Sequence, residues 1–135
     1  MADPTPGAHA EERLRRDLMI WLSTVRPDGR PHLVPVWFLW DSGTILIFSK
    51  PDQKIRNLRS ASAVVLALDD TATGEDVVMI EGTAALLPPG EVDPTLAPYA
   101  EKYAGKLQEM GWTPASMAAS YTEAIRITPT KFRAG

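Results

Sequence analysis

The fold is decided by the stretch Met19-Ile20-Trp21-Leu22-Ser23-Thr24-Val25-Arg26-Pro27-Asp28-Gly29-Arg30. Its first seven residues are mostly apolar or β-branched, which is typical of a buried strand. Pro27, Asp28 and Gly29 then place three strong turn formers in a row. Because the chain reverses at such a turn, we expect a hairpin whose second strand runs from His32 to Trp40.

The following segments extend this hairpin into a larger antiparallel sheet. Asp41-Ser42-Gly43 turns the chain into an apolar strand at residues 44–49. Two long apolar runs at residues 63–68 and 77–86 predict the fourth and fifth strands, and residues 121–127 alternate as a last strand. The two long runs indicate strands that are buried on both faces. They favour a sheet that closes on itself as a small barrel.

Helices are expected on either side of these strands. Residues 11–17 are charged and strongly helix-forming. Residues 92–110 are predicted to form a helix with a break near Gly105, and residues 114–120 a short helix with Thr113 as its N-cap. Residues 1–10 are expected to be a flexible tail that precedes one domain at residues 11–135.

Composition limits the class of protein. A chain of 135 residues that is 44% hydrophobic fits one soluble domain, and it has no cysteine for disulfides or thiolate chemistry. The N-terminal residues lack the basic and apolar regions of a signal peptide, and no segment approaches a transmembrane length. We therefore expect a cytoplasmic protein that does not bind membranes.

Positive charge is concentrated in one short segment. Residues 50–59 hold four basic residues and one acid, a net charge of +3, whereas the whole chain carries −3. The next basic residue is Lys102, and eight acids lie between it and Arg59. Such a chain has no broad basic face for nucleic acid, so a small anionic ligand is the better expectation.

The basic segment also has the pattern of a helix start. Asp52 is a credible N-cap, and Lys54 falls in the first turn beside backbone N–H groups that have no helical partner. A hydroxyl from Ser49 and the basic side chains could converge there on one phosphate. A capped surface helix with solvated lysines explains the same pattern, and the Asp52 carboxylate would compete for the same donors.

Several kinds of chemistry have no support in the sequence. Of two histidines, His9 lies in the expected tail, so only His32 remains for a metal site or a Ser-His-Asp triad. No glycine-rich nucleotide motif is present. Tyr99, Tyr103 and Tyr121 could each donate a proton but more often pack. We expect no metal and assign no catalytic residue.

The order of these pieces resembles the pyridoxamine phosphate oxidase-like split β-barrel superfamily, and within it the actinobacterial flavin/deazaflavin oxidoreductases that use coenzyme F420. The resemblance covers residues 11–133. Four motifs carry it: Leu22-Ser23-Thr24-Val25-Arg26-Pro27-Asp28-Gly29-Arg30-Pro31-His32, Val34-Pro35-Val36-Trp37-Phe38-Leu39-Trp40-Asp41, Ser49 with Lys54-Ile55-Arg56-Asn57-Leu58-Arg59, and Ala124-Ile125-Arg126-Ile127-Thr128-Pro129-Thr130-Lys131.

The resemblance implies a mainly β (α+β) fold, a six- to seven-stranded antiparallel split β-barrel with short flanking helices. It also implies a homodimer with the cofactor at the interface, and an F420-dependent oxidoreductase that transfers a hydride between reduced F420 and a small unsaturated or quinone-like acceptor. The implied cofactor-binding residues are Val34, Pro35, Val36 and Trp37 along the ring, and Ser49, Lys50, Lys54, Ile55, Arg56 and Asn57 around the phosphate.

Three alternatives share the fold. FMN offers a similar ring and phosphate, so an FMN-dependent oxidoreductase would use almost the same contacts. A flavin or deazaflavin carrier would bind without turnover. A haem-binding split barrel is disfavoured because His32 is the one histidine outside the expected tail that could serve as an axial ligand.

Overall fold

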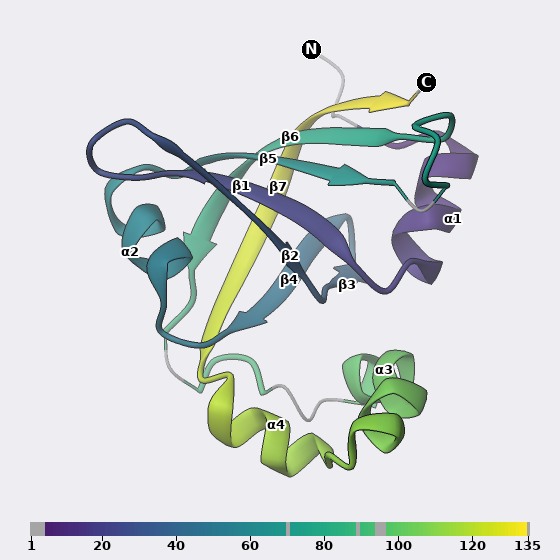
Figure 1. The fold of residues 1–135 in the computed structure, drawn as a ribbon, viewed down its shortest axis with the longest axis vertical. Coiled ribbons are helices and arrows are strands. Elements are labelled where there is room, and N and C mark those ends of the chain that lie inside the picture. The colour runs from purple at the N-terminus through teal and green to yellow at the C-terminus, as the bar shows by residue number, and fades with distance from the viewer. Residues whose placement is uncertain (1–4, 70, 89, 94–96, 135) are drawn as a thin grey trace.

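Seven antiparallel strands form one curled sheet, in the order β2-β1-β5-β6-β7-β4-β3 (Figure 1). The computed structural model describes residues 5–69, 71–88, 90–93 and 97–134. The strands are β1 (Ile20–Val25), β2 (Pro31–Val36), β3 (Leu39–Asp41), β4 (Thr44–Ser49), β5 (Ala63–Leu68), β6 (Val78–Leu86) and β7 (Glu123–Ala134). The helices are α1 (Ala8–Arg16), α2 (Gln53–Ser60), α3 (Ala97–Met110) and α4 (Pro114–Ser120). This half-barrel with flanking helices confirms the predicted split β-barrel.

Two apolar clusters hold the elements together. The larger cluster lies inside the curl of the sheet and includes Ile20, Leu22 and Ile80, with Leu14 of α1 and Ile55 of α2 packed against them. A second cluster joins α3 and α4 to β3 and β4. Figure 1 shows the α3–α4 pair at one end of the sheet, so the second cluster fixes the position of these two helices.

The predicted second strand is wrong in its extent. Instead of one strand from His32 to Trp40, the chain forms β2 and β3 with Trp37 and Phe38 between them. The Phe38 N–H donates to the Tyr103 hydroxyl at 2.8 Å, and the Phe38 carbonyl accepts from Lys102 Nζ at 2.8 Å. Since side chains of α3 take both backbone groups, Phe38 does not continue the ladder.

The long apolar strands were also predicted wrongly in one respect. Burial alternates along β5 and β6, so only one face of each strand is buried within this chain. The last strand is longer than predicted and pairs with β6 along its length, from Leu86 opposite Ile125 to Val78 opposite Ala134. The curled sheet therefore has one apolar inner face and one outer face that this chain leaves open.

The helices differ from expectation at their ends. Helix α1 begins at Ala8 and buries Ala10 and Arg13, so residues 8–10 of the predicted tail are part of the packed domain, while residues 1–4 lie outside the described residues. Helix α3 is described from Ala97, because residues 94–96 of the predicted helix lie outside the described residues, and it continues through Gly105 without a break. No atom lies within 4 Å of a Cβ placed on Gly105, so this exposed glycine costs only helix propensity. Thr113 caps α4 as predicted.

Candidate functional site

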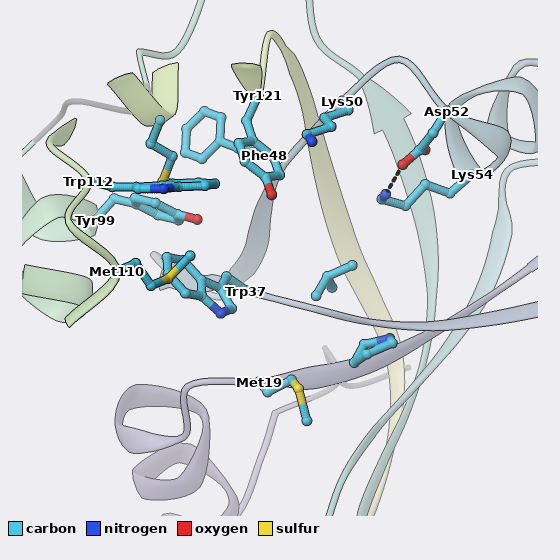
Figure 2. A pocket seen from close by; sticks show the side chains of 13 residues that line it. Met19, Trp37, Phe48, Lys50, Asp52, Lys54, Tyr99, Met110, Trp112 and Tyr121 are labelled. Carbon is cyan, nitrogen blue, oxygen red and sulfur yellow. Dashed lines mark hydrogen bonds and ion pairs between the residues drawn. The ribbon is translucent and has the colours of Figure 1, made fainter. Parts of the chain in front are cut away.

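A cavity of about 310 Å³ lies where β2 ends, between the sheet and the α3–α4 pair (Figure 2). Side chains of two kinds line it. One side, here called the aromatic end, is lined by Trp37, Phe48, Tyr99, Met110, Trp112 and Met117. The other side, here called the lysine end, is lined by Lys50, Asp52 and Lys54. Figure 2 shows Tyr121 between the two ends. The cavity therefore offers a flat apolar wall and a charged rim to one ligand.

The lysine end is formed by the loop from β4 to α2. Lys54 Nζ lies 2.6 Å from Asp52 Oδ2, and the Lys54 side chain is only 11% exposed. Asp52 occupies the N-cap position of α2, yet its side chain makes no capping hydrogen bond. Lys50 stands 5.5 Å from the centre of the Tyr121 ring. Two cations thus lie beside the N-terminus of a helix, where the helix dipole also favours an anion.

The aromatic end is built from stacked rings. Trp37 lies parallel to Tyr103, with ring centroids 4.3 Å apart and an interplanar angle of 2°. Tyr99 meets Phe48 edge to face at 4.8 Å. These contacts join the end of β2, strand β4 and helix α3, and such ring pairs add stability beyond the area they bury. The flat wall of the cavity is therefore a rigid part of the protein.

Tyr103 fixes the backbone that carries Trp37. Its hydroxyl accepts from the Phe38 N–H and donates to the Leu18 carbonyl at 2.7 Å. Burial raises the pKa of Tyr103 above its ordinary value, so the hydroxyl keeps its proton. The preceding residue, Lys102, places its Nζ 3.7 Å from the centre of the Phe38 ring. Burial lowers the pKa of Lys102 to about 8. Helix α3 thereby holds the connection between β2 and β3.

Tyr99 differs from Tyr103 in its hydrogen bonding. The residue is 1% exposed, and among the described residues its buried hydroxyl has no hydrogen-bond partner. Burial raises the pKa of this phenol above its ordinary value, with a smaller contribution from the neighbouring tyrosines. Tyr99 is therefore a neutral donor at the wall of the cavity.

The structure brings together five of the ten residues predicted from the sequence: Pro35, Val36, Trp37, Lys50 and Lys54 line the cavity. The other five face elsewhere in this chain. Ser49 donates to the Lys50 carbonyl, Arg56 donates to Gln53, and Asn57 donates to Thr24 in the interior. Ile55 is in the core, and Val34 is partly buried on β2. Their part in cofactor binding stays a prediction.

The sequence did not identify the residues of the aromatic end outside β2. Tyr99, Met110, Trp112 and Met117 come from α3, α4 and the turn between them. Tyr99 was considered as a proton donor that more often packs. Its burial depends on how α3 packs, which a helical pattern does not reveal.

The described part of the chain does not group metal-ligating side chains. No group of three or more His, Cys, Asp or Glu side chains there is placed to hold a metal ion. His32, on β2, does not line the cavity. Within the same residues, no helix is long and apolar enough to cross a membrane.

A split β-barrel with a basic, aromatic-lined cavity at the end of β2 is a fold of the type that binds flavins. Residues 7–134 match the pyridoxamine 5'-phosphate oxidase family, and the chain belongs to that family. The family match therefore spans almost all of the packed domain. This membership supports an oxidoreductase activity.

Solved structures agree with this assignment. A protein described as an F420 reductase is 26% identical, with a TM-score of 0.68, and the match covers 96% of this chain and 98% of that chain. An FAD-binding protein from Mesorhizobium loti is 18% identical, with a TM-score of 0.67 and coverage of 95% and 92%. A haem storage protein from Vibrio cholerae is 14% identical, with a TM-score of 0.68 and coverage of 94% and 93%. The last two similarities show the shared fold alone.

Proposed function

We propose that the protein is an F420-dependent oxidoreductase that transfers a hydride between reduced F420 and a small unsaturated or quinone-like acceptor. The observation that carries this proposal is the cavity in which Lys50 and Lys54 lie opposite the Trp37 wall. The similarity to an F420 reductase supports the choice of cofactor. When bound, reduced F420 supplies the hydride.

The residues present fit such a cofactor. Lys50, Lys54 and the first N–H groups of α2 are donors suited to a phosphate. The segment from Pro35 to Trp37, at the end of β2, offers a flat edge for a tricyclic ring. The aromatic end keeps water from that ring, and in a dry site hydrogen bonds and charges act more strongly. The protein thus binds, orients and shields the cofactor.

The proposed function includes a homodimer, because the outer face of the sheet is apolar beside the cavity. Ser23 of β1 pairs with Leu33 on one side and Val65 on the other, and Ala67 of β5 pairs with Trp21 and Met79. These positions share one face. Exposed apolar side chains are concentrated there: Trp21, Val25, Leu33, Val65 and Met79. Such a continuous patch is typical of a protein interface.

The patch is continuous with the cavity. Pro35 lines the cavity and pairs with Trp21 of the patch, and Met19, two residues before Trp21, also lines the cavity. A second copy seated on this face would therefore cover the open side of the site. Leu33→Asp should convert a dimer to a monomer in sedimentation experiments and weaken cofactor binding. A wild-type monomer that binds the cofactor would contradict the shared site.

Replacing Lys54 tests the proposed phosphate site directly. Lys54→Met keeps the buried stem and removes the charge, so we expect F420 binding to weaken by about 1 to 3 kcal/mol. Arg59→Ala is the matched control, because Arg59 also lies on α2 but does not line the cavity. Equal titration curves for wild type and Lys54→Met would overturn the phosphate assignment. Equal losses in both variants would indicate general charge effects alone.

FMN is the alternative cofactor, because it presents a similar ring and phosphate to the same residues. The lysine end does not distinguish the two ligands. Parallel titrations with F420 and FMN at equal ionic strength do so, since tighter binding of FMN would move the protein to the flavin-dependent branch. Binding without turnover of any acceptor would favour a carrier.

A further inference from the structure

The Tyr99 hydroxyl is a buried donor in the wall of the cavity. It has no hydrogen-bond partner among the described residues, although the residue is 1% exposed. An unsatisfied buried hydroxyl costs about 1 to 3 kcal/mol. Native proteins therefore rarely keep one unless a ligand or an ordered water completes the bond.

The position of Tyr99 indicates which kind of ligand could accept a hydrogen bond from its hydroxyl. The side chain lines the aromatic end, and Figure 2 shows its ring between Trp112 and Trp37 with the hydroxyl directed toward the middle of the cavity. Met110, which is 47% exposed, and Met117 lie close to these rings. Methionine side chains move easily, so a ligand can reach the hydroxyl by displacing one of them.

The remaining surface of the aromatic end has no charge. Apart from the Tyr99 hydroxyl and the indole N–H groups, its lining side chains are hydrocarbon or thioether. A charged ligand would be desolvated there without a counter-ion, which is unfavourable. A flat, uncharged molecule with one hydrogen-bond acceptor matches this surface.

We propose that the aromatic end binds the electron acceptor as a flat, uncharged conjugated ketone, and that the Tyr99 hydroxyl donates a hydrogen bond to its carbonyl oxygen. This inference rests on the proposed function, which supplies the hydride. A C–H bond of the reduced cofactor would break, which oxidises the cofactor by two electrons. The hydride would form a new C–H bond at the β-carbon of the ketone while the π electrons shift toward the carbonyl oxygen to give an enolate. Water then supplies the proton. Tyr99 stabilises the charge that develops on the oxygen without losing its own proton.

The same donor suits the acceptor better than it suits the cofactor ring. The polar edge of a flavin or deazaflavin ring carries two carbonyl groups with an N–H between them, so it needs several donors and an acceptor. The aromatic end supplies one phenol, with no carboxylate or amide side chain beside it. A ligand with a single carbonyl pairs with this phenol and brings no further polar atom into the aromatic end.

A pair of matched ligands tests the inference on the protein without cofactor. Benzylideneacetone is a flat conjugated ketone, and the matching diene replaces its C=O by C=CH₂ without changing the shape. We expect the ketone to bind wild type about tenfold more tightly than the diene, the effect of one hydrogen bond. Tyr99→Phe should remove this preference and, because it deletes an unsatisfied hydroxyl, should not lower the stability of the fold.

The infrared C=O band of the bound ketone gives a second readout. A donated hydrogen bond lowers the frequency, so the band should lie lower in wild type than in Tyr99→Phe. Equal binding of ketone and diene to wild type, or an unchanged band in Tyr99→Phe, would overturn the inference and assign the hydroxyl to buried water.

The experiment is then repeated with saturating F420. Ketone that still binds with the Tyr99-dependent band supports the inference, whereas displacement of the ketone would assign Tyr99 to the cofactor and overturn it. A protein that shows the Tyr99-dependent band but binds neither F420 nor FMN would contradict the proposed function alone. The two proposals therefore fail in different ways.

Discussion

Replacing Tyr103 by phenylalanine should destabilise the protein while leaving the stacked ring in place. The substitution removes one oxygen atom, which accepts from the Phe38 N–H at 2.8 Å and donates to the Leu18 carbonyl at 2.7 Å. Phe38 and Tyr103 are both fully buried. One lost hydrogen bond contributes about 1 kcal/mol, and a buried N–H left without a partner costs about 1 to 3 kcal/mol. We expect a loss of about 2 to 4 kcal/mol.

Denaturant unfolding measures this loss, with Tyr121→Phe as the matched control. Tyr121 lines the same cavity but is partly exposed, so water can replace its hydroxyl group. The free energy of unfolding of this control should therefore lie within about 0.5 kcal/mol of the wild-type value. The melting temperature of Tyr103→Phe should fall by roughly 10 °C for a domain of this size.

The position of Trp37 gives the functional consequence of the same change. Because Phe38 follows Trp37, a loosened Phe38 backbone should also loosen the wall of the cavity. Ligand binding at the cavity should weaken even where the variant is fully folded. If Tyr103→Phe is as stable as Tyr121→Phe, the hydrogen bonds of Tyr103 do not hold the segment between β2 and β3 in place.

Three further changes have defined outcomes. Asp52→Asn removes the carboxylate that pairs with Lys54 at 2.6 Å, so inorganic phosphate should bind about two- to fivefold more tightly by calorimetry. Weaker binding of phosphate would show that the Asp52 carboxylate does not compete with phosphate for Lys54. Lys102 has a pKa of about 8 in the folded protein and ordinarily 10.5. Between these pH values the unfolded state binds more protons than the folded state, so the free energy of unfolding of wild type relative to Lys102→Met should rise with pH. A difference in free energy of unfolding that does not change with pH would contradict the lowered pKa of Lys102. Gly82→Ala would place a Cβ 2.9 Å from the Thr128 carbonyl oxygen, where the register between β6 and β7 shifts, and should cost about 1 to 3 kcal/mol in denaturant unfolding.

The sequence predicted the strands well because their signals are local. The Pro27-Asp28-Gly29 turn and the apolar run at residues 63–68 each occur where expected, and β5 has the predicted bounds. Thr113 and Pro114 mark the start of α4 because capping depends on neighbouring residues alone. Where turn chemistry or capping decided the structure, the pattern was sufficient.

The failures have long-range causes. Strand His32 to Trp40 is interrupted because Tyr103, more than 60 residues later, takes the N–H of Phe38. The apolar character of β5 and β6 suggested burial on both faces. In this chain one face of each strand is buried, and the other lies on the outer face of the sheet. Composition cannot tell a buried face from a face that a second copy would cover.

The candidate site shows the same division. Lys54 and Trp37 were identified from motifs in their own segments, and both line the cavity. Asn57 belongs to the same motif as Lys54, yet its amide points inward to Thr24 at 2.9 Å. Tyr99 enters the site because α3 packs against β4. Motifs located the lysine end, whereas only tertiary packing assembled the aromatic end.

Binding of F420 to the purified wild-type protein and to Lys54→Met is the most direct test of the account. Titration of each with F420 and, separately, with FMN, followed by tryptophan fluorescence and ligand polarisation, gives four dissociation constants at equal ionic strength. We expect saturable F420 binding that is tighter than FMN binding and that is weaker by about 1 to 3 kcal/mol in Lys54→Met. Failure of wild type to bind F420, or equal binding by the variant, would contradict it.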